Sequence, residues 1–228
     1  MLSYARLSKC ALVSLLFLLP GVALADFRVH SPIDSVANDP SANHSGKTQY
    51  GYVEHDELAR VLGEAQPYRD EKELSSEALP FKCVGGCLVQ HGELYYWRFQ
   101  SRRRVSITDS EGATKIFWTS SPVEIHPFYC KNGKQTVPVD EDVVKVFNDG
   151  AGFRNVNARQ IPESKLRAIL ASGTPADSGP FFDGSDREGS GCLLLKNGDC
   201  LFWMLYQKKY LLLQDEYADA CILEAPTE

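Results

Sequence analysis

Two pairs of residues in this sequence have the types and spacing of a zinc site. Three residues separate Cys83 from Cys87, and three separate His126 from Cys130. Thiolate sulfur and imidazole nitrogen are common ligands of tetrahedral structural zinc. The same cysteines are also candidates for disulfide bonds, so the choice between the two chemistries depends on the compartment that the protein occupies.

The first 25 residues indicate export. They combine a short basic start, an apolar run from Cys10 to Leu19, and the small residues Ala23 and Ala25 in the frame of a cleavable signal. A membrane helix needs about 18 uninterrupted apolar residues, and no stretch of the sequence reaches that length. We therefore expect a mature chain that begins at Asp26, an exported location (periplasmic or secreted), and no stable membrane insertion.

Six cysteines remain after Cys10 is removed with the signal, and an even number in an exported chain favours disulfide bonds over zinc. A tight hairpin turn at Asn197-Gly198 would place Cys200 opposite Leu195 and leave Cys192 on the other face. We therefore expect Cys192 and Cys200 not to pair with each other, and we expect no metal and no cofactor. The disulfide candidates are Cys83, Cys87, Cys130, Cys192, Cys200 and Cys221.

The common catalytic motifs are missing from the sequence. It contains no Walker loop, no dinucleotide fingerprint and no H-E-x-x-H, and the nearest approach to G-x-S-x-G, around Ser190, has Glu188 in place of the first glycine. A carboxylate pair for glycoside hydrolysis is defined by distance in space, so Glu93 and Asp199 remain candidates for one. The sequence thus favours a non-enzymatic protein and leaves a secreted hydrolase open as an alternative.

Two segments of the chain have similar sequences, at an offset of 106 residues. Three residues of the first copy, Gly92, Trp97 and Asp109, coincide with Gly198, Trp203 and Asp215 of the second. Gly-Cys-Leu precedes each copy with a one-residue difference in spacing, which is consistent with a turn of altered length. The pattern predicts two pseudo-repeats, at about 80–139 and 186–228, produced either by duplication or by convergence of two three-strand meanders.

Alternation along the strands predicts which face of each copy is buried. The face expected to form the core carries Tyr95, Trp97 and Phe99 in the first copy and Leu201, Trp203 and Leu205 in the second. The opposite face of the first copy suits water, with Tyr96, Arg98 and Gln100. In the second copy that face carries Phe202, Met204 and Tyr206, so the helix expected at 162–172 or a partner must cover it.

The remaining elements follow from periodicity and turn residues. Helices are expected at 55–65, capped by Asp56, and at 162–172, with a third short helix at 140–150. We interpret residues 26–50 as a flexible polar leader and residues 51–228 as a single mostly-β domain. The expected fold is α+β and mainly antiparallel β: two related meanders in a sandwich-like, disulfide-stapled body with two or three short helices. Strands are expected at 92–100, 104–109, 114–120, 123–130 and 135–139.

Charge and one long loop suggest a function in binding. Without the signal the chain loses two basic residues and has a net charge of −8, which disfavours nucleic-acid binding and favours basic partners. Residues 173–191 lack periodicity, and loops of that length are usually functional or disordered. The candidate partner-binding residues are Phe181, Phe182, Asp183, Asp186 and Glu188 of this loop and Arg102, Arg103 and Arg104 of a basic hairpin tip.

The hypothesis that combines these observations is a periplasmic inhibitor or immunity-type protein. Its protein partner would be a basic enzyme that acts on the cell envelope, such as a peptidoglycan hydrolase or a lipase. A glycan-binding module is a second alternative to this hypothesis, beside the hydrolase. It would use exposed Trp97, Trp203 or Tyr96 as stacking platforms.

Overall fold

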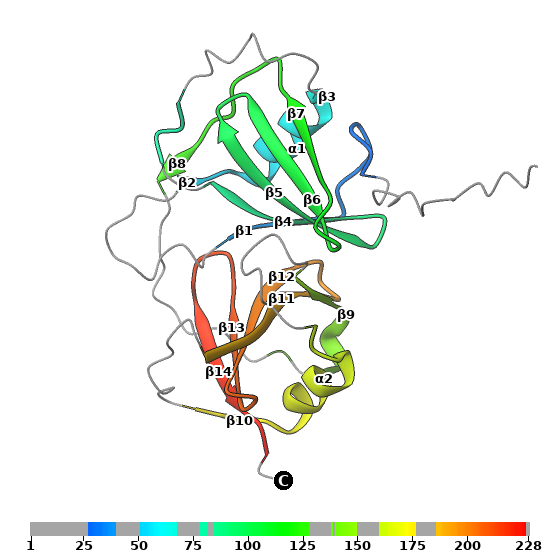
Figure 1. Ribbon diagram of the computed structural model, residues 1–228, viewed down its shortest axis with the longest axis vertical. Coiled ribbons are helices and arrows are strands. Elements are labelled where there is room, and N and C mark those ends of the chain that lie inside the picture. Colours follow the sequence, from blue (N-terminus) through cyan, green and yellow to red (C-terminus); the bar gives the residue numbers. More distant parts are fainter. Residues whose placement is uncertain are drawn as a thin grey trace, which may run out of the picture.

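The fold consists of two six-stranded antiparallel sheets, each with one helix (Figure 1). This architecture confirms the expected class, mainly antiparallel β with two helices. The description comes from a computed structural model. The residues that it describes are 27–39, 51–67, 78–81, 84–127, 138, 140–149, 160–176 and 186–226.

The first sheet packs its helix against the face that carries Trp97. Helix α1 (His55–Glu64) buries Leu58, Val61 and Leu62 on that face, as its spacing predicts. The helix is preceded by Glu54 as its N-cap, without a side-chain bond, and not by Asp56. In pairing order the strands are β1 (Ser35–Asn38), β4 (Gly85–Gln90), β5 (Glu93–Ser101), β6 (Arg104–Asp109), β7 (Thr114–Trp118) and β3 (Gln66–Pro67); β2 (Gly51–Tyr52) pairs separately with β8 (His126–Pro127).

The second sheet repeats this arrangement. Helix α2 (Glu163–Ser172) lies between Pro162 and Gly173, as predicted, and packs on the face that carries Trp203. A 3₁₀ turn, η3 (Asp140–Asp142), precedes the first strand. In pairing order the strands are β9 (Val143–Asn148), β11 (Arg187–Leu195), β12 (Cys200–Tyr206), β13 (Tyr210–Gln214), β14 (Ala220–Glu224) and β10 (Thr174–Pro175).

The two sheets have the same strand order and the same connectivity. In each, an edge strand leads to the helix, a two-residue strand follows, and a four-strand meander then ends beside that short strand. We refer to residues 27–127 as the first repeat and to residues 138–226 as the second. We propose that both descend from one duplicated unit, because the correspondence extends beyond the meanders to the edge strands and helices.

An asparagine at the end of each edge strand provides an independent sign of this equivalence. Asn38, at the end of β1, exchanges two hydrogen bonds with the backbone of Val53: its Nδ2 donates to the carbonyl at 2.9 Å and its Oδ1 accepts from the amide at 3.0 Å. Asn148, at the end of β9, makes the same two bonds with Ile161, at 3.1 and 2.7 Å. In both repeats the amide group ties the edge strand to the segment before the helix.

The two tryptophans are interior and equivalent, as the sequence predicts. Trp97 and Trp203 are both 0% exposed, and each indole N–H donates to a backbone carbonyl. The acceptors differ: Cys87 of β4 at 3.2 Å for Trp97, and Phe147 of β9 at 3.0 Å for Trp203. Trp97 pairs with Gly86, and Trp203 pairs with Gly191. Both predicted core faces are confirmed, because their residues belong to the clusters packed around these two tryptophans.

The repeats pack together through their remaining faces (Figure 1). In the apolar cluster at this interface, each residue and its counterpart from the other repeat are both present, as in the self-complementary interface of a twofold dimer. The first repeat therefore covers Phe202, whereas Met204 and Tyr206 on the same face form a separate cluster. The helix expected to cover this face, α2, lies on the opposite one. The equivalent pairs are Ala37 with Phe147, Cys87 with Cys192, Val89 with Leu194, Leu94 with Cys200, and Tyr96 with Phe202.

Tyr96 corrects one prediction about the first copy. Arg98 and Gln100 are exposed as expected, but Tyr96 is 1% exposed and its hydroxyl donates to a carboxylate oxygen of Asp149. Burial, together with the charge of Asp149, raises the pKa of Tyr96 well above its usual value, so the phenol remains the donor. An alternation pattern within one sheet carries no information about the second sheet that covers it.

Three expectations about local structure were wrong. Residues 35–38, within the expected leader, form β1. The helix expected at 140–150 is limited to the turn Asp140–Asp142, because the valines that follow favour the extended conformation of β9. Of the strand expected at 123–130, the part that the structure describes pairs only at β8.

The hairpin between β11 and β12 also differs from the prediction. The first repeat joins β4 to β5 through a two-residue turn, His91-Gly92, whereas in the second Leu195 accepts from Gly198 N and donates to Asp199 O, both at 2.9 Å. The second loop is therefore one residue longer, which confirms the predicted difference in turn length. As a result Cys200 pairs with Leu194, and Cys192 lies on the same face as Cys200, not on the opposite one.

Candidate functional site

A pocket of about 470 Å³ lies at one rim of the interface between the repeats. The first repeat contributes β1 with the residues before it, Ile33 and Asp34, and the start of α1. The second repeat contributes the β11–β12 hairpin and the turn after β13. Because four separate segments meet here, the pocket exists only when the two repeats are packed together.

The pocket is acidic. Among the described residues that line it there is no lysine or arginine, and His55 is the one basic side chain. Carboxylates gathered around a concave surface produce a negative potential that attracts cations. The carboxylates that line it are Asp34, Asp56, Asp199, Asp215 and Glu216.

His55 and Glu216 connect the two repeats across this pocket. Nε2 of His55 lies 2.9 Å from a carboxylate oxygen of Glu216, and the same oxygen accepts from the backbone amide of Asn38 at 3.4 Å. The hydrogen bond with Glu216 raises the pKa of His55. Burial opposes ionisation of Glu216, but the bonds with His55 and Asn38 outweigh it and lower the pKa of that carboxyl.

The opposite rim of the interface shows what the acidic pocket lacks. Lys145 of β9 is the equivalent of Ser35 of β1. Ser35 pairs with Val89 and Lys145 pairs with Leu194, and Val89 and Leu194 occupy equivalent positions in the two repeats. The ammonium of Lys145 donates to the carbonyl of Gly92 and lies 3.9 Å from Glu93, the equivalents of Gly198 and Asp199. Ser35 is uncharged and donates its hydroxyl to Gly198 O. One rim therefore contains a lysine ammonium group, whereas none of the described residues that line the other rim is a lysine or an arginine.

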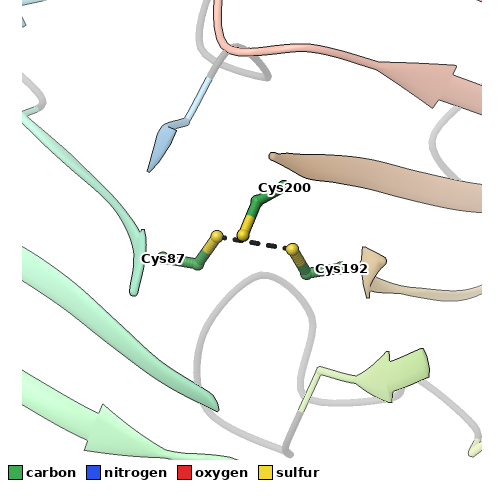
Figure 2. Close-up of side chains that lie close together, drawn as sticks. All are labelled: Cys87, Cys192 and Cys200. Atoms are coloured by element: carbon green, nitrogen blue, oxygen red, sulfur yellow. Dashed lines mark hydrogen bonds between the residues drawn. The ribbon is translucent and has the colours of Figure 1, made fainter. Parts of the chain in front are cut away.

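Three cysteines lie close together at the interface between the repeats (Figure 2). The Sγ atoms of Cys87 and Cys192 are 3.5 Å apart, and Cys200, which also lines the pocket, completes a group whose sulfurs all lie within 4.8 Å of one another. Burial raises the pKa of the Cys192 thiol, whereas hydrogen bonds from Cys192 and Cys87 lower that of Cys200.

The disulfide framework expected from the sequence is not supported. No disulfide bond joins Cys87, Cys192, Cys200 and Cys221, while Cys83 and Cys130 lie outside the described residues. Cys87 belongs to the three-thiol group, and His126 is exposed on β8 with Glu124 at 3.8 Å. Cys87 lies far from Cys192 and Cys200 in the sequence but contacts them because the two repeats pack through equivalent faces. The spacing of the cysteines along the sequence does not indicate that contact.

The basic tip has internal partners. Arg102 donates through Nε to the carbonyl of Val123 at 3.2 Å, and Arg103 donates to the carbonyl of Ser120. Arg104 is half-buried in β6. Two of these arginines therefore hold the segment after β7, and none of the three lines the pocket.

The long loop is described only at its ends. Phe181, Phe182 and Asp183 lie outside the described residues, so their proposed contact with a partner stays a prediction. Asp186 accepts a hydrogen bond from the Gln207 side chain at 2.9 Å, and Glu188 is half-buried at the start of β11. Neither of these two acids is among the residues that line the pocket.

The residues behind the two alternative functions lie in unsuitable places. Trp97, Trp203 and Tyr96 are all buried, so none can act as an exposed platform for a sugar. Asp199 lines the pocket, but Glu93 lies at the opposite rim beside Lys145 and is not among the lining residues. The structure thus does not bring the expected carboxylate pair together in this pocket.

Comparison with known proteins adds no relative. A scan against protein-family models and searches of curated proteins and of solved structures find no match to this chain.

Among the helices that the structure describes, neither is long and apolar enough to cross a membrane.

Sequence reasoning singled out Asp199, Asp215 and Cys200 but did not bring them together with His55 and Glu216. The alignment of the copies contained one usable signal. Where the first copy has Ser110 after its turn aspartate, the second has Glu216. Positions at which two repeats differ in charge are candidates for a function that only one repeat has acquired.

Proposed function

We propose that this protein is an exported binding protein that captures a cationic group of a basic partner in the acidic pocket between its repeats. In its most concrete form it is a periplasmic inhibitor or immunity-type protein, and the partner is a basic enzyme that acts on the cell envelope. The observation that carries the proposal is the pocket lining, which offers five carboxylates and, among the described residues, no lysine or arginine.

The opposite rim supports this choice of ligand. There, Lys145 supplies an ammonium group to Glu93 and to the carbonyl of Gly92. In the acidic pocket the equivalent Asp199 has Asn197 as a hydrogen-bond partner at 2.7 Å, and none of the described residues that line the cavity is a lysine. A lysine or arginine side chain from a partner would supply the charge that Lys145 supplies at the other rim.

Substituting Ser35 by lysine tests the proposal directly. By analogy with Lys145, the new side chain would place its own ammonium beside Asp199 and occupy the pocket from within. The probe is a short lysine-rich peptide, and its binding to the mature chain is measured by calorimetry at low and at physiological salt. We expect Ser35→Lys and Glu216→Gln each to weaken peptide binding about tenfold or more. The first variant neutralises the pocket with its own ammonium group, and the second removes one of the carboxylates that attract the peptide.

Glu93→Gln is the control, since Glu93 is the equivalent of the pocket residue Asp199 and lies at the rim that already contains a lysine. It should bind the peptide as the unmodified chain does. Equal loss in Glu93→Gln and Glu216→Gln would indicate a general effect of net charge and would overturn the pocket as the site. The inhibitor form is tested with a basic peptidoglycan hydrolase, whose activity the unmodified chain should reduce and Ser35→Lys should not.

A further inference from the structure

The three thiols at the centre of the interface form a second candidate site, separate from the carboxylates of the pocket. Cys87 of β4 and Cys192 of β11 come from different repeats, and Cys200 of β12 lies against both. All three point inward from the sheets toward a common point (Figure 2). The spread of their sulfurs, within 4.8 Å of one another, is one that a single metal ion could bridge.

We propose that Cys87, Cys192 and Cys200 bind one thiophilic d10 metal ion, Cu(I) in preference to Zn(II). Thiolate sulfur is a soft ligand, and sites built only of sulfur favour soft ions such as Cu(I) and zinc over magnesium, calcium or manganese. Because the three residues lie on rigid, hydrogen-bonded strands, the site is largely formed before the ion arrives.

The number of ligands favours Cu(I). Structural zinc takes four ligands from cysteine, histidine and carboxylate side chains. The group described here offers three sulfurs, and the nearby Ser35 hydroxyl, 3.3 Å from the sulfur of Cys200, is not a usual zinc ligand. Three thiolates around one ion form a trigonal site, which Cu(I) accepts readily.

The surroundings provide both protection and a route of entry. Cys87 and Cys192 are 0% exposed, and the rest of the interface around them is mainly apolar, which excludes water from the sulfurs. Cys200 is the one member that lines the acidic pocket. Carboxylates around that pocket concentrate cations at its surface, so an ion would reach Cys200 first and the two deeper sulfurs afterwards.

Binding would have two consequences for the protein. The ligands bind as thiolates, so each thiol that coordinates the ion releases its proton, and the affinity falls in acid. Since the sulfurs come from both repeats, the ion would also join them and raise the stability of the folded chain.

The test uses the reduced mature chain without oxygen, with Cu(I) supplied by a chromophoric chelator that competes for it and Zn(II) supplied in a parallel titration. We expect one Cu(I) per chain, three sulfur neighbours by X-ray absorption spectroscopy, and at least hundredfold weaker binding in Cys192→Ser. Cys221→Ser, which alters a half-buried thiol outside the group, should bind as the unmodified chain does, and so should Cys83→Ser/Cys130→Ser.

A second measurement guards against variants that merely fold poorly. Cu(I) should raise the unfolding temperature of the unmodified chain and of Cys221→Ser, but not that of Cys192→Ser or Cys200→Ala, whatever their starting values. Equal retention of Cu(I) by all variants, fewer than three sulfur neighbours, or tighter binding of zinc than of Cu(I) would overturn the proposal. None of these outcomes depends on peptide binding in the pocket, so the two proposals can fail separately.

Discussion

Cys87 and Cys192 occupy equivalent positions in the two repeats, and their sulfur atoms meet 3.5 Å apart. Two equivalent atoms can meet in this way only near the axis that relates the repeats, so this contact marks the approximate twofold axis of the chain. Departures from symmetry can then be found by comparing the two sides. Cys200 opposite Leu94 and Ser35 opposite Lys145 are such departures, and both are adjacent to the candidate sites.

Equivalent burial predicts equivalent losses for the two tryptophans. Trp97→Ala and Trp203→Ala should each lower the free energy of unfolding by about 3–5 kcal/mol, because each removes a fully buried indole from a helix-covered core. The measurement is urea unfolding of the mature chain, followed by circular dichroism. If one substitution cost less than about 1 kcal/mol, the two repeats would not contribute comparable cores.

The sequence predicted these cores because alternation and helical spacing are local signals. Tyr95, Trp97 and Phe99 share a face whatever that face meets, and the face of Leu166 in α2 follows from the 3.6-residue period. The interface between the repeats could not be predicted in this way. The burial of Tyr96 and the contact between Cys87 and Cys192 depend on how one sheet docks on another.

A single loop residue decided another error. Asn197-Gly198 is a common two-residue hairpin signal, yet the chain uses Gly198, at φ +90°, to close a loop that begins one residue earlier. A shift of one residue moves every side chain of a strand to the other face, and it reversed the expected relation between Cys192 and Cys200. Turn type is set by backbone geometry that several sequences share, so it was the weakest part of the prediction.

Close backbone contact predicts that two glycines cannot be replaced. A Cβ atom at Gly86 would lie 1.9 Å from the carbonyl oxygen of Ala37, and one at Gly191 would lie 1.9 Å from that of Phe147. Gly86→Ala and Gly191→Ala should therefore separate the edge strands from their sheets and cost about 1–3 kcal/mol or more. Gly63→Ala is the control: in α1 its Cβ would meet nothing within 4 Å, and it should stabilise the chain by about 0.5–1 kcal/mol. Thermal unfolding of the three variants measures these changes in stability. A loss of stability in Gly63→Ala equal to that in the other two would contradict the role of close backbone contact.

The hydrogen bond between Tyr96 and Asp149 should contribute to docking of the repeats. Tyr96→Phe leaves the interface packing intact but removes the donor to a buried carboxylate, so it should cost about 1–3 kcal/mol. Asp149→Ala should cost a similar amount, and the double variant should cost less than the sum of the two, because the bond is lost only once. A double-mutant cycle by urea unfolding measures the coupling, and strictly additive losses would show that the bond contributes nothing.

The pair formed by His55 and Glu216 predicts a stability that depends on pH. The pKa of His55 is raised above its usual 6.5, so its contribution is fully present below that pH and is lost as the pH rises through the folded-state value. The pKa of Glu216 is lowered from 4.5, so its contribution is present above that pH and is lost as the pH falls through the folded-state value. Between about pH 4.5 and 6.5 both contributions act together.

The difference in unfolding free energy between the unmodified chain and His55→Gln should therefore be largest in this window. His126→Gln, at an exposed histidine that is not among the residues lining the pocket, should show no such maximum. A flat difference profile for His55→Gln would mean that the contact does not persist in solution.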